Sequence, residues 1–149
     1  MNREILFRGK CVPDSKYAGE WVTGGCVAPD SDCKKRNEGL IVEYFGGNTT
    51  ITYHVDPDTV GEFTGLFDNR GVKIFEGDIV KHPYIDPIFR DLVESKDGDG
   101  VTSEVVFHDG AFCVKYDIND FIYLDSFTRH GHVEVVGNIH DNPELLSTK

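Results

Sequence analysis

The sequence predicts a mainly β or α+β protein with few short helices. Two observations lead to this fold class. The chain has ten Phe and six Tyr against a single Met, and aromatic residues are enriched in strands. Its apolar residues also form short runs, separated by Asn, Asp and Gly residues that favour tight turns. Both features are typical of a small sheet or barrel and not of a helix bundle.

The clearest β pattern lies in residues 60–81, VGEFTGLFDNRGVKIFEGDIVK. Two strand-like runs flank a DNRG turn that ends at Gly71, and a second turn around Gly77 leads into a third run. We expect both glycines to adopt positive φ, which glycine does without steric cost. Asp78 is expected to accept a backbone N–H within the second turn. The stretch therefore predicts a three-stranded meander, with these three residues as structural turn residues.

Four runs with strand character precede this meander, at residues 3–8, 20–27, 40–45 and 50–55. The second run contains two adjacent glycines, Gly24 and Gly25, which indicate a bulge or an edge. The last two runs are separated by a short GGNT segment and predict a hairpin. Polar loops are expected at 9–19 and 28–39.

Beyond residue 81, the region 82–100 is irregular, with a short helix expected to begin at Pro87 after an Asp86 cap. The following elements are a hairpin of residues 101–107 and 111–116, a segment 117–125 that suits either strand or helix, and a last long strand at 132–139. Asn142 is then expected to cap a short helix that starts at Pro143.

Composition limits the classes of function. The chain has 149 residues, which predicts one domain or two very small ones, and a net charge of −11. That charge argues against general nucleic-acid binding, because phosphate contacts need a basic surface. The N-terminus lacks the apolar core of a signal peptide, and no run is long enough for a membrane span, so we expect a cytoplasmic protein. The cysteines, Cys11, Cys26, Cys33 and Cys113, show no C-x-x-C spacing and are expected to be free thiols.

Four segments of the chain can be compared with known families. They are REILFRGK at 3–10, EWVTGGCV at 20–27, TVGEFTGLFDNRGVKIFEGDIVK at 59–81 and VEVVGNIHDNPELL at 133–146. The I-x-E-G-D-I-V segment and the G-N-I-x-x-N-P-E-L-L ending are the most specific of these patterns. In these blocks the chain resembles the YopX family of phage and prophage proteins from end to end. The region between 82 and 132 matches that family only in its hairpin pattern.

The resemblance implies a single YopX-like domain over residues 1–149, with an N-terminal β segment (1–59) and a C-terminal half (60–149) that forms a small SH3-like β-barrel. It also implies a gene carried by a phage, a prophage or a similar mobile element, and a protein that works in the cytoplasm of a bacterial host cell. The family has no established activity, so the resemblance supplies no catalytic and no cofactor-binding residue.

Two patterns suggest metal ions. His130 and His132 have the H-x-H spacing that can place two imidazoles on one side of a strand. Beside Gly131, this spacing more often marks a turn and the start of a strand, so we expect no metal there and keep the two histidines as candidates only. The DGDG run at 97–100 fails as an EF-hand, because the oxygen ligands required further along are missing.

A third pattern, Asp58 with Glu94 and Lys96, has the residue types of a metal-dependent phosphodiesterase. So short a motif arises readily by chance. Two other features are better explained by structural roles than by binding sites. The basic run at 34–36 is flanked by acidic residues, which suits a solvated loop, and Trp21 suits a core position better than an exposed platform.

With no catalytic set and no cofactor site, the sequence favours a non-enzymatic accessory protein that acts through protein–protein contacts and self-association. Open strand edges are the features that could pair between copies in a homo-oligomer. Two alternatives remain open. One is the metal-dependent nuclease based on Asp58, and the other is an acidic decoy that occupies a host nucleic-acid-binding protein.

Overall fold

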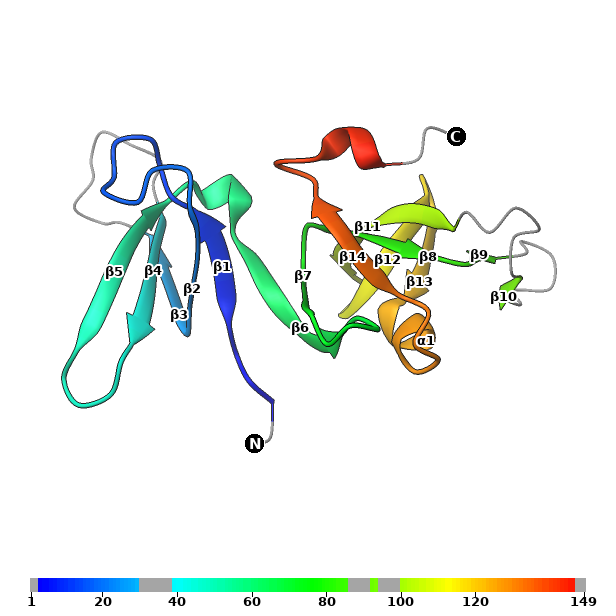
Figure 1. Cartoon of the computed structure of the whole chain (residues 1–149), viewed down its shortest axis with the longest axis horizontal. Coiled ribbons are helices and arrows are strands. Elements are labelled where there is room, and N and C mark those ends of the chain that lie inside the picture. The colour runs from blue at the N-terminus through cyan, green and yellow to red at the C-terminus, as the bar shows by residue number, and fades with distance from the viewer. Residues whose placement is uncertain (1–2, 30–38, 86–91, 94–99, 147–149) are drawn as a thin grey trace. The chain divides into compact units, whose positions relative to one another are not determined.

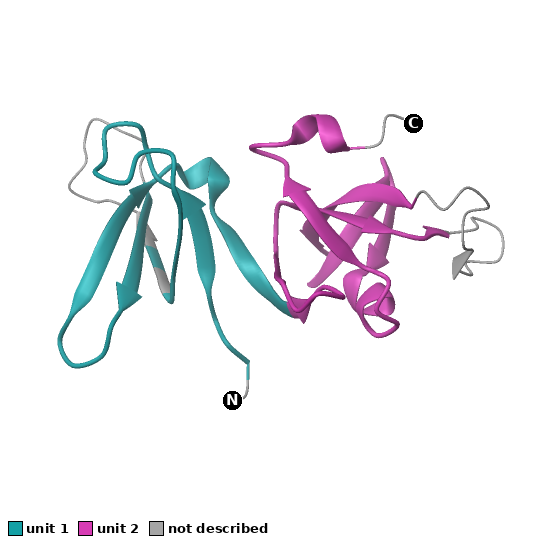
Figure 2. Cartoon of the chain, viewed as in Figure 1, with its two compact units in different colours: residues 1–65 teal, residues 66–149 magenta. Residues whose placement is uncertain are grey.

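The structure, a computed structural model, describes residues 3–29, 39–85, 92–93 and 100–146. It divides into two compact units, unit 1 (Met1–Gly65) and unit 2 (Leu66–Lys149) (Figure 2). Strands dominate both units, and the described residues include one α-helix of five residues and two short 3₁₀ segments. The predicted mainly β fold is therefore confirmed. No helix in this described part is long and apolar enough to cross a membrane.

Unit 1 contains β1 (Phe7–Lys10), β2 (Trp21–Gly24), β3 (Cys26–Pro29), β4 (Gly39–Tyr44), β5 (Thr50–Val55), the 3₁₀ segment η1 (Pro57–Thr59) and the start of β6 (Gly61–Phe67) (Figure 1). β1 pairs antiparallel with β2 and β6, while β4 pairs antiparallel with β3 and β5. The predicted hairpin of 40–45 and 50–55 is confirmed by β4 and β5. The strand expected at 3–8 lies at Phe7–Lys10 instead.

The run predicted as one strand over 20–27 is two strands in different sheets, separated at Gly25. Close packing at Gly24 explains the break. A Cβ on Gly24 would lie 2.3 Å from the carbonyl oxygen of Val42, so only glycine lets β2 approach β4 this closely. The core of unit 1 consists of Cys11, Val22, Ile41, Tyr53 and Val55.

Unit 2 contains β7 (Lys73–Phe75), β8 (Asp78–His82), β9 (Tyr84–Ile85), β10 (Leu92–Val93), β11 (Val101–His108), β12 (Ala111–Asp117), β13 (Asp120–Tyr123), α1 (Leu124–Thr128), β14 (Glu134–Asn138) and the 3₁₀ segment η2 (Pro143–Leu145). Five of these strands form an antiparallel sheet in the order β13-β12-β11-β8-β14. In the described residues this sheet is open, and β13 and β14 are its terminal strands.

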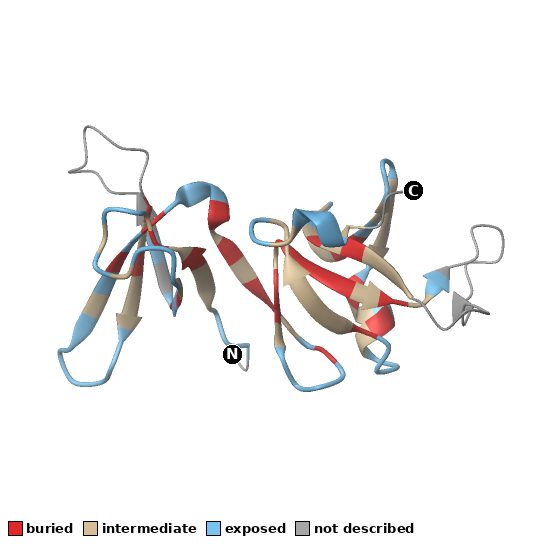
Figure 3. Ribbon diagram, turned by 45° about the horizontal axis from the view of Figure 1, so that its top comes forward, coloured by how far each residue is buried: buried red, intermediate tan, exposed pale blue. Residues whose placement is uncertain are grey.

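One hydrophobic core fills unit 2. Its fully buried side chains come from β7, β8, β11, β12, α1 and the residue before β14: Ile74, Val80, Val105, Val114, Leu124, Phe127 and Val133. Figure 3 shows buried positions on strands of both units. Along β11, the buried residues Ser103 and Val105 alternate with less buried ones, as expected for a strand with one buried face. Each buried Val, Leu or Phe side chain contributes about 1.5–3 kcal/mol.

Three local predictions need correction. The segment 117–125, which suited strand or helix, contains both, because β13 runs directly into α1. The helix expected from Pro87 is wrong at Leu92–Val93, which pair with β9 as strand β10, and its other residues lie outside the described part of the chain. Asn142 precedes η2 without capping it, because its Oδ1 accepts the backbone N–H of Asn138 at 3.4 Å.

Candidate interaction site

The turn between β6 and β7 is built around a buried carboxylate. Asp68 Oδ1 accepts the backbone N–H groups of Arg70 (2.8 Å) and Val72 (2.9 Å), and Oδ2 accepts the N–H of Val135 in β14 (3.0 Å). Burial alone would raise the pKa of this fully buried side chain. The three backbone N–H groups and the Arg70 guanidinium outweigh burial and hold the pKa of Asp68 below its usual value.

The same turn covers the outer edge of β14. Arg70 Nη2 donates to the carbonyl oxygen of Val135 (2.9 Å), and the Asn69 N–H donates to the carbonyl oxygen of Val133 (2.9 Å). Together with Asp68, these groups satisfy backbone atoms that a neighbouring strand would otherwise use. One terminal strand of the five-stranded sheet is thus closed to further pairing at these positions.

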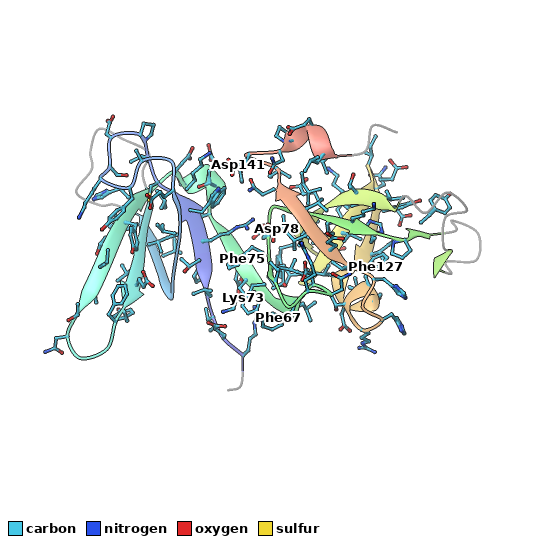
Figure 4. The ribbon with its side chains drawn as sticks, in the orientation of Figure 1. Phe67, Lys73, Phe75, Asp78, Phe127 and Asp141 are labelled. Carbon is cyan, nitrogen blue, oxygen red and sulfur yellow. The ribbon has the colours of Figure 1, made fainter. Side chains whose placement is uncertain are left out.

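The second predicted turn connects β7 to β8. Gly77 has φ of 87° and Gly71, in the preceding turn, has φ of 79°, both in the region that glycine favours. The Phe75 N–H donates to Asp78 Oδ2 at 2.8 Å, and the Asp78 side chain is almost fully buried (Figure 4). Gly77 also donates its N–H to Val105 and accepts the N–H of Ile139. The turn therefore ties three segments of unit 2 together.

A third turn follows β14 and meets the second one. Asn138 Oδ1 accepts the N–H groups of His140 (3.0 Å) and Asp141 (2.9 Å), and the Asn142 N–H donates to the carbonyl oxygen of Asn138 (2.8 Å). The preceding bond from Ile139 to Gly77 joins this turn to the second. The I-x-E-G-D-I-V segment and the G-N-I-x-x-N-P-E-L-L ending are thus neighbours in space. The hydrogen bonds described here hold the backbone of the two turns in place.

The two histidines named as metal candidates follow α1. His130 and His132 are exposed, and their ring centroids lie 6.2 Å apart. In the described part of the chain, no group of three or more His, Cys, Asp or Glu could hold a metal ion. The imidazole of another histidine, His108, is stacked on the Phe121 ring, with ring centroids 3.7 Å apart. His130 and His132 stay candidates only, and the expectation that no metal binds there stays untested.

A Ser–His contact escaped the sequence analysis. His82 Nε2 lies 2.8 Å from Ser103 Oγ, and its Nδ1 lies 2.8 Å from the carbonyl oxygen of Pro83. Since a carbonyl oxygen only accepts, Nδ1 donates to Pro83, and in the neutral imidazole the Ser103 hydroxyl then donates to Nε2. Both side chains are about 2% exposed and the Phe127 ring lies 4.6 Å from the imidazole, so a substrate cannot reach the pair. Only the register of β8 with β11 brings the two residues together.

A pocket of about 430 Å³ lies in unit 1 beside the loop after β1. Its lining includes Lys10, Cys11 and Asp56. Burial raises the pKa of the Cys11 thiol, which keeps the group protonated and poorly nucleophilic. The thiol of Cys113 in β12 is likewise buried, with a raised pKa. Neither cysteine has the environment of a catalytic nucleophile.

The remaining predicted residues are scattered. Asp58 lies in η1, where its backbone N–H donates to Asp56 Oδ1. Trp21 is half-buried, and the Arg8 guanidinium lies 5.0 Å from its ring centroid, so it is neither a core residue nor an open platform. Outside the described residues lie Cys33, the basic run at 34–36, Glu94, Lys96, Asp97 and Asp99.

Exposed aromatic and apolar side chains stand out more than any polar cluster. Tyr44 and Phe45, which we call the aromatic tip, are 68% and 55% exposed where β4 turns into β5. In unit 2, Tyr123 of β13 is 66% exposed and Ile118 of the preceding turn is 80% exposed. Contiguous exposed apolar surface, such as the two adjacent rings of the aromatic tip, often marks a protein-contact site. Each of these surfaces is a separate candidate interaction site on its own unit.

Comparisons with known proteins agree with the architecture. A family model described as YopX protein matches residues 15–147. The crystal structure of protein EF1440 from Enterococcus faecalis has a similar fold, with a TM-score of 0.52 and 22% sequence identity. The match covers 96% of this chain and 98% of that one. No curated protein matches the chain. The family match spans most of the sequence, and the chain belongs to the YopX family.

Proposed function

We propose that this chain is an accessory protein of a phage or prophage, and that it acts through protein–protein contacts, including contacts between copies of itself. It works in the cytoplasm of the bacterial host cell. Membership of the YopX family supports the mobile-element origin. The observation that carries the contact role is the aromatic tip, where two neighbouring aromatic side chains are mostly exposed.

The aromatic tip is held in place by its own turn. The Phe45 N–H donates to the carbonyl oxygen of Thr49 (3.0 Å), and the Thr49 N–H donates back to that of Gly46 (3.3 Å). A fixed tip loses less conformational entropy on docking than a loose loop would. Burying each aromatic side chain in a contact would contribute about 1.5–3 kcal/mol. The tip therefore suits self-association, which in a two-fold dimer places the same surface on both copies.

Sedimentation velocity tests this proposal. The wild type should show reversible association at tens of micromolar, an order-of-magnitude choice for a moderate contact. Replacing both tip residues, Tyr44→Thr and Phe45→Thr, keeps β propensity while removing the rings, and should give a monomer. Ile5→Thr changes another exposed apolar residue of unit 1 and should leave association unchanged. A wild type that stays monomeric over this range would refute self-association.

The architecture of unit 2 supports a finer description of the fold. We propose that its five antiparallel strands form a small, partly open SH3-like barrel around the single core. We also propose that both units form one cooperative domain over residues 1–149. The boundary at residues 65 and 66 lies inside strand β6 (Gly61–Phe67), whereas independent domains are usually separated by an irregular linker.

The two alternative functions remain predictions. The nuclease reading combines Asp58 with Glu94 and Lys96, and the last two lie outside the described residues. Manganese-dependent nicking of a plasmid that disappears in Glu94→Ala would support that reading and displace the contact role. The acidic-decoy reading depends on the net charge of −11, and it predicts competition with nucleic acid for a host protein.

A further inference from the structure

We propose that strand β13 of unit 2 is a docking edge for an extended, basic segment of a partner protein, which adds a strand to the sheet. This inference deepens the proposed contact role and rests on it. It concerns a different surface from the aromatic tip and a different occupant from a second copy.

The two terminal strands of the five-stranded sheet differ. At the start of β14, Asp68 and Arg70 occupy the outer backbone groups of Val135, and Asn69 occupies the carbonyl oxygen of Val133, the residue before the strand. On the opposite side, β13 pairs with β12, and the described residues include no strand beyond it. An unprotected edge offers a row of backbone N–H and C=O groups, which an extended peptide can pair with. Of the two terminal strands, β13 is the one suited to receive a strand.

One face of β13 carries aromatic rings. Tyr123 lies opposite Cys113 and Phe121 lies opposite Lys115, which places both rings on the same face of the sheet. The Phe121 ring is stacked on His108, with centroids 3.7 Å apart and an interplanar angle of 8°. Tyr123 is 66% exposed. A Lys or Arg side chain from an added strand could lie over these ring faces.

The charge at the end of β13 also favours a basic partner. Asp117 and Asp120 lie opposite each other across the turn, and Asp117 Oδ1 already accepts the Ile118 N–H (2.7 Å). Within the described part of the chain, no Lys or Arg is within ion-pair distance of either carboxylate. Lys115, on the neighbouring strand β12, lies opposite Glu104 on its other side.

The same charges disfavour a second copy at this edge. If two β13 strands paired with each other, Asp117 and Asp120 of one copy would approach those of the other. The contact has only four residues per strand, so this repulsion would be a large part of its energy. A basic segment would instead be attracted by the carboxylates of Asp117 and Asp120. Alternating residues fit best, with cationic side chains over the rings and apolar ones on the other face.

Peptide binding tests this proposal. The probe is a fluorescein-labelled peptide of about ten residues with alternating Lys and Val, long enough for one strand. One comparison peptide has Glu in place of Lys, and another has Pro in place of the central Val residues, which prevents strand pairing. Fluorescence anisotropy at about 0.15 M salt should show binding of the Lys peptide and at least about five-fold weaker binding of the other two.

Variants locate the contact. The double substitution Asp117→Asn and Asp120→Asn keeps the acceptor for the Ile118 N–H, and it should weaken Lys-peptide binding at least about five-fold. Asp58→Asn with Asp56→Asn removes two exposed carboxylates in unit 1 and serves as the matched control, with no change expected. Amide hydrogen exchange should show added protection at residues 120–123 when the Lys peptide is bound.

Three results would overturn the docking edge: equal binding of the Lys and Pro peptides, unchanged binding by the double variant, or added protection elsewhere. If, without peptide, protection of residues 120–123 rises with protein concentration, a second copy occupies β13 and the basic-segment proposal is wrong. The double variant should still sediment like the wild type. Failure of the peptide experiment with self-association intact would therefore remove only this inference, whereas loss of self-association alone would remove only that part of the proposed function.

Discussion

Asp68 and Val135 lie 67 residues apart in the chain, yet Asp68 Oδ2 accepts the Val135 N–H at 3.0 Å. This hydrogen bond joins the turn after β6 to the last strand of unit 2. The carboxylate is buried and has three backbone donors, so it positions β14 and covers its edge in one arrangement. A residue with the sequence signature of an ordinary turn thus organises a long-range contact.

Asp68→Asn should destabilise the protein by about 2–4 kcal/mol, because an amide cannot supply two acceptor oxygens to three N–H groups. Urea unfolding followed by circular dichroism measures the change. Asp56→Asn, at an exposed carboxylate that accepts the Asp58 N–H, is the control and should cost less than about 1 kcal/mol. If both variants lost the same free energy of unfolding, the buried contacts of Asp68 would not stabilise the protein more than an exposed turn carboxylate does.

The effect of Asp68 should depend on pH. Its pKa is lowered in the folded state from an ordinary value of 3.8, so folding favours the ionised form. The stabilisation is therefore fully present above the unfolded pKa and is lost as pH falls through the folded pKa. The stability difference between the wild type and Asp68→Asn should be constant near neutral pH and shrink in acid below about pH 4. A difference that grows in acid would contradict this assignment.

Gly77→Ala should lower the melting temperature, since an alanine at φ of 87° costs about 1–2 kcal/mol. A Cβ there would meet its nearest neighbours at 3.8 Å, so the backbone conformation and not crowding is the cause. Gly25→Ala, at a glycine without positive φ, is the control. Both folded variants should sediment like the wild type, and altered association in Gly77→Ala would make this turn part of a functional site.

Asp78→Ala should cost about 1–3 kcal/mol, because it leaves the buried Phe75 N–H without its carboxylate acceptor. Thermal unfolding measures this loss. Asp141→Ala, at an exposed aspartate in the turn after β14, should cost less. If Asp78→Ala kept the wild-type melting temperature but lost self-association, its carboxylate would have a role in binding and not in the turn.

Gly24→Ala tests whether the two units form one cooperative domain. The new Cβ would lie 2.3 Å from the Val42 carbonyl oxygen, which should destabilise unit 1 by about 1–3 kcal/mol. If both units unfold together, amide exchange in the core strands of unit 2 should become faster by the same factor as in unit 1. Faster exchange confined to residues 1–65 would show that the units unfold independently.

Local chemistry accounts for the parts of the fold that the sequence predicts well. The turns at Gly71 and Gly77 follow from the preference of glycine for positive φ, and the β4–β5 hairpin follows from two apolar runs around a Gly-rich segment. The parts it misses depend on contacts between distant residues. The division at Gly25 requires the close approach of Gly24 to Val42, and the His82–Ser103 contact requires the register of β8 with β11.

The candidate site was harder to predict than the fold for the same reason. Exposure of Tyr44 and Phe45 depends on how β4 packs, since aromatic residues in short strands are more often core. The difference between the covered β14 edge and the β13 edge depends on strand order, which one sequence does not reveal. His130 and His132 illustrate the converse, a spacing visible in sequence for which the described residues supply no third ligand.

Concentration-dependent NMR spectra test the central claim most directly. If the aromatic tip mediates self-association, amide signals of residues 44–49 should shift progressively between about 10 μM and 1 mM protein, a range that spans weak contacts. Signals of residues 120–123 should stay constant over the same range, because a second copy does not occupy β13. Signals from the tip that do not change with concentration, or shifts centred on β13, would contradict this account.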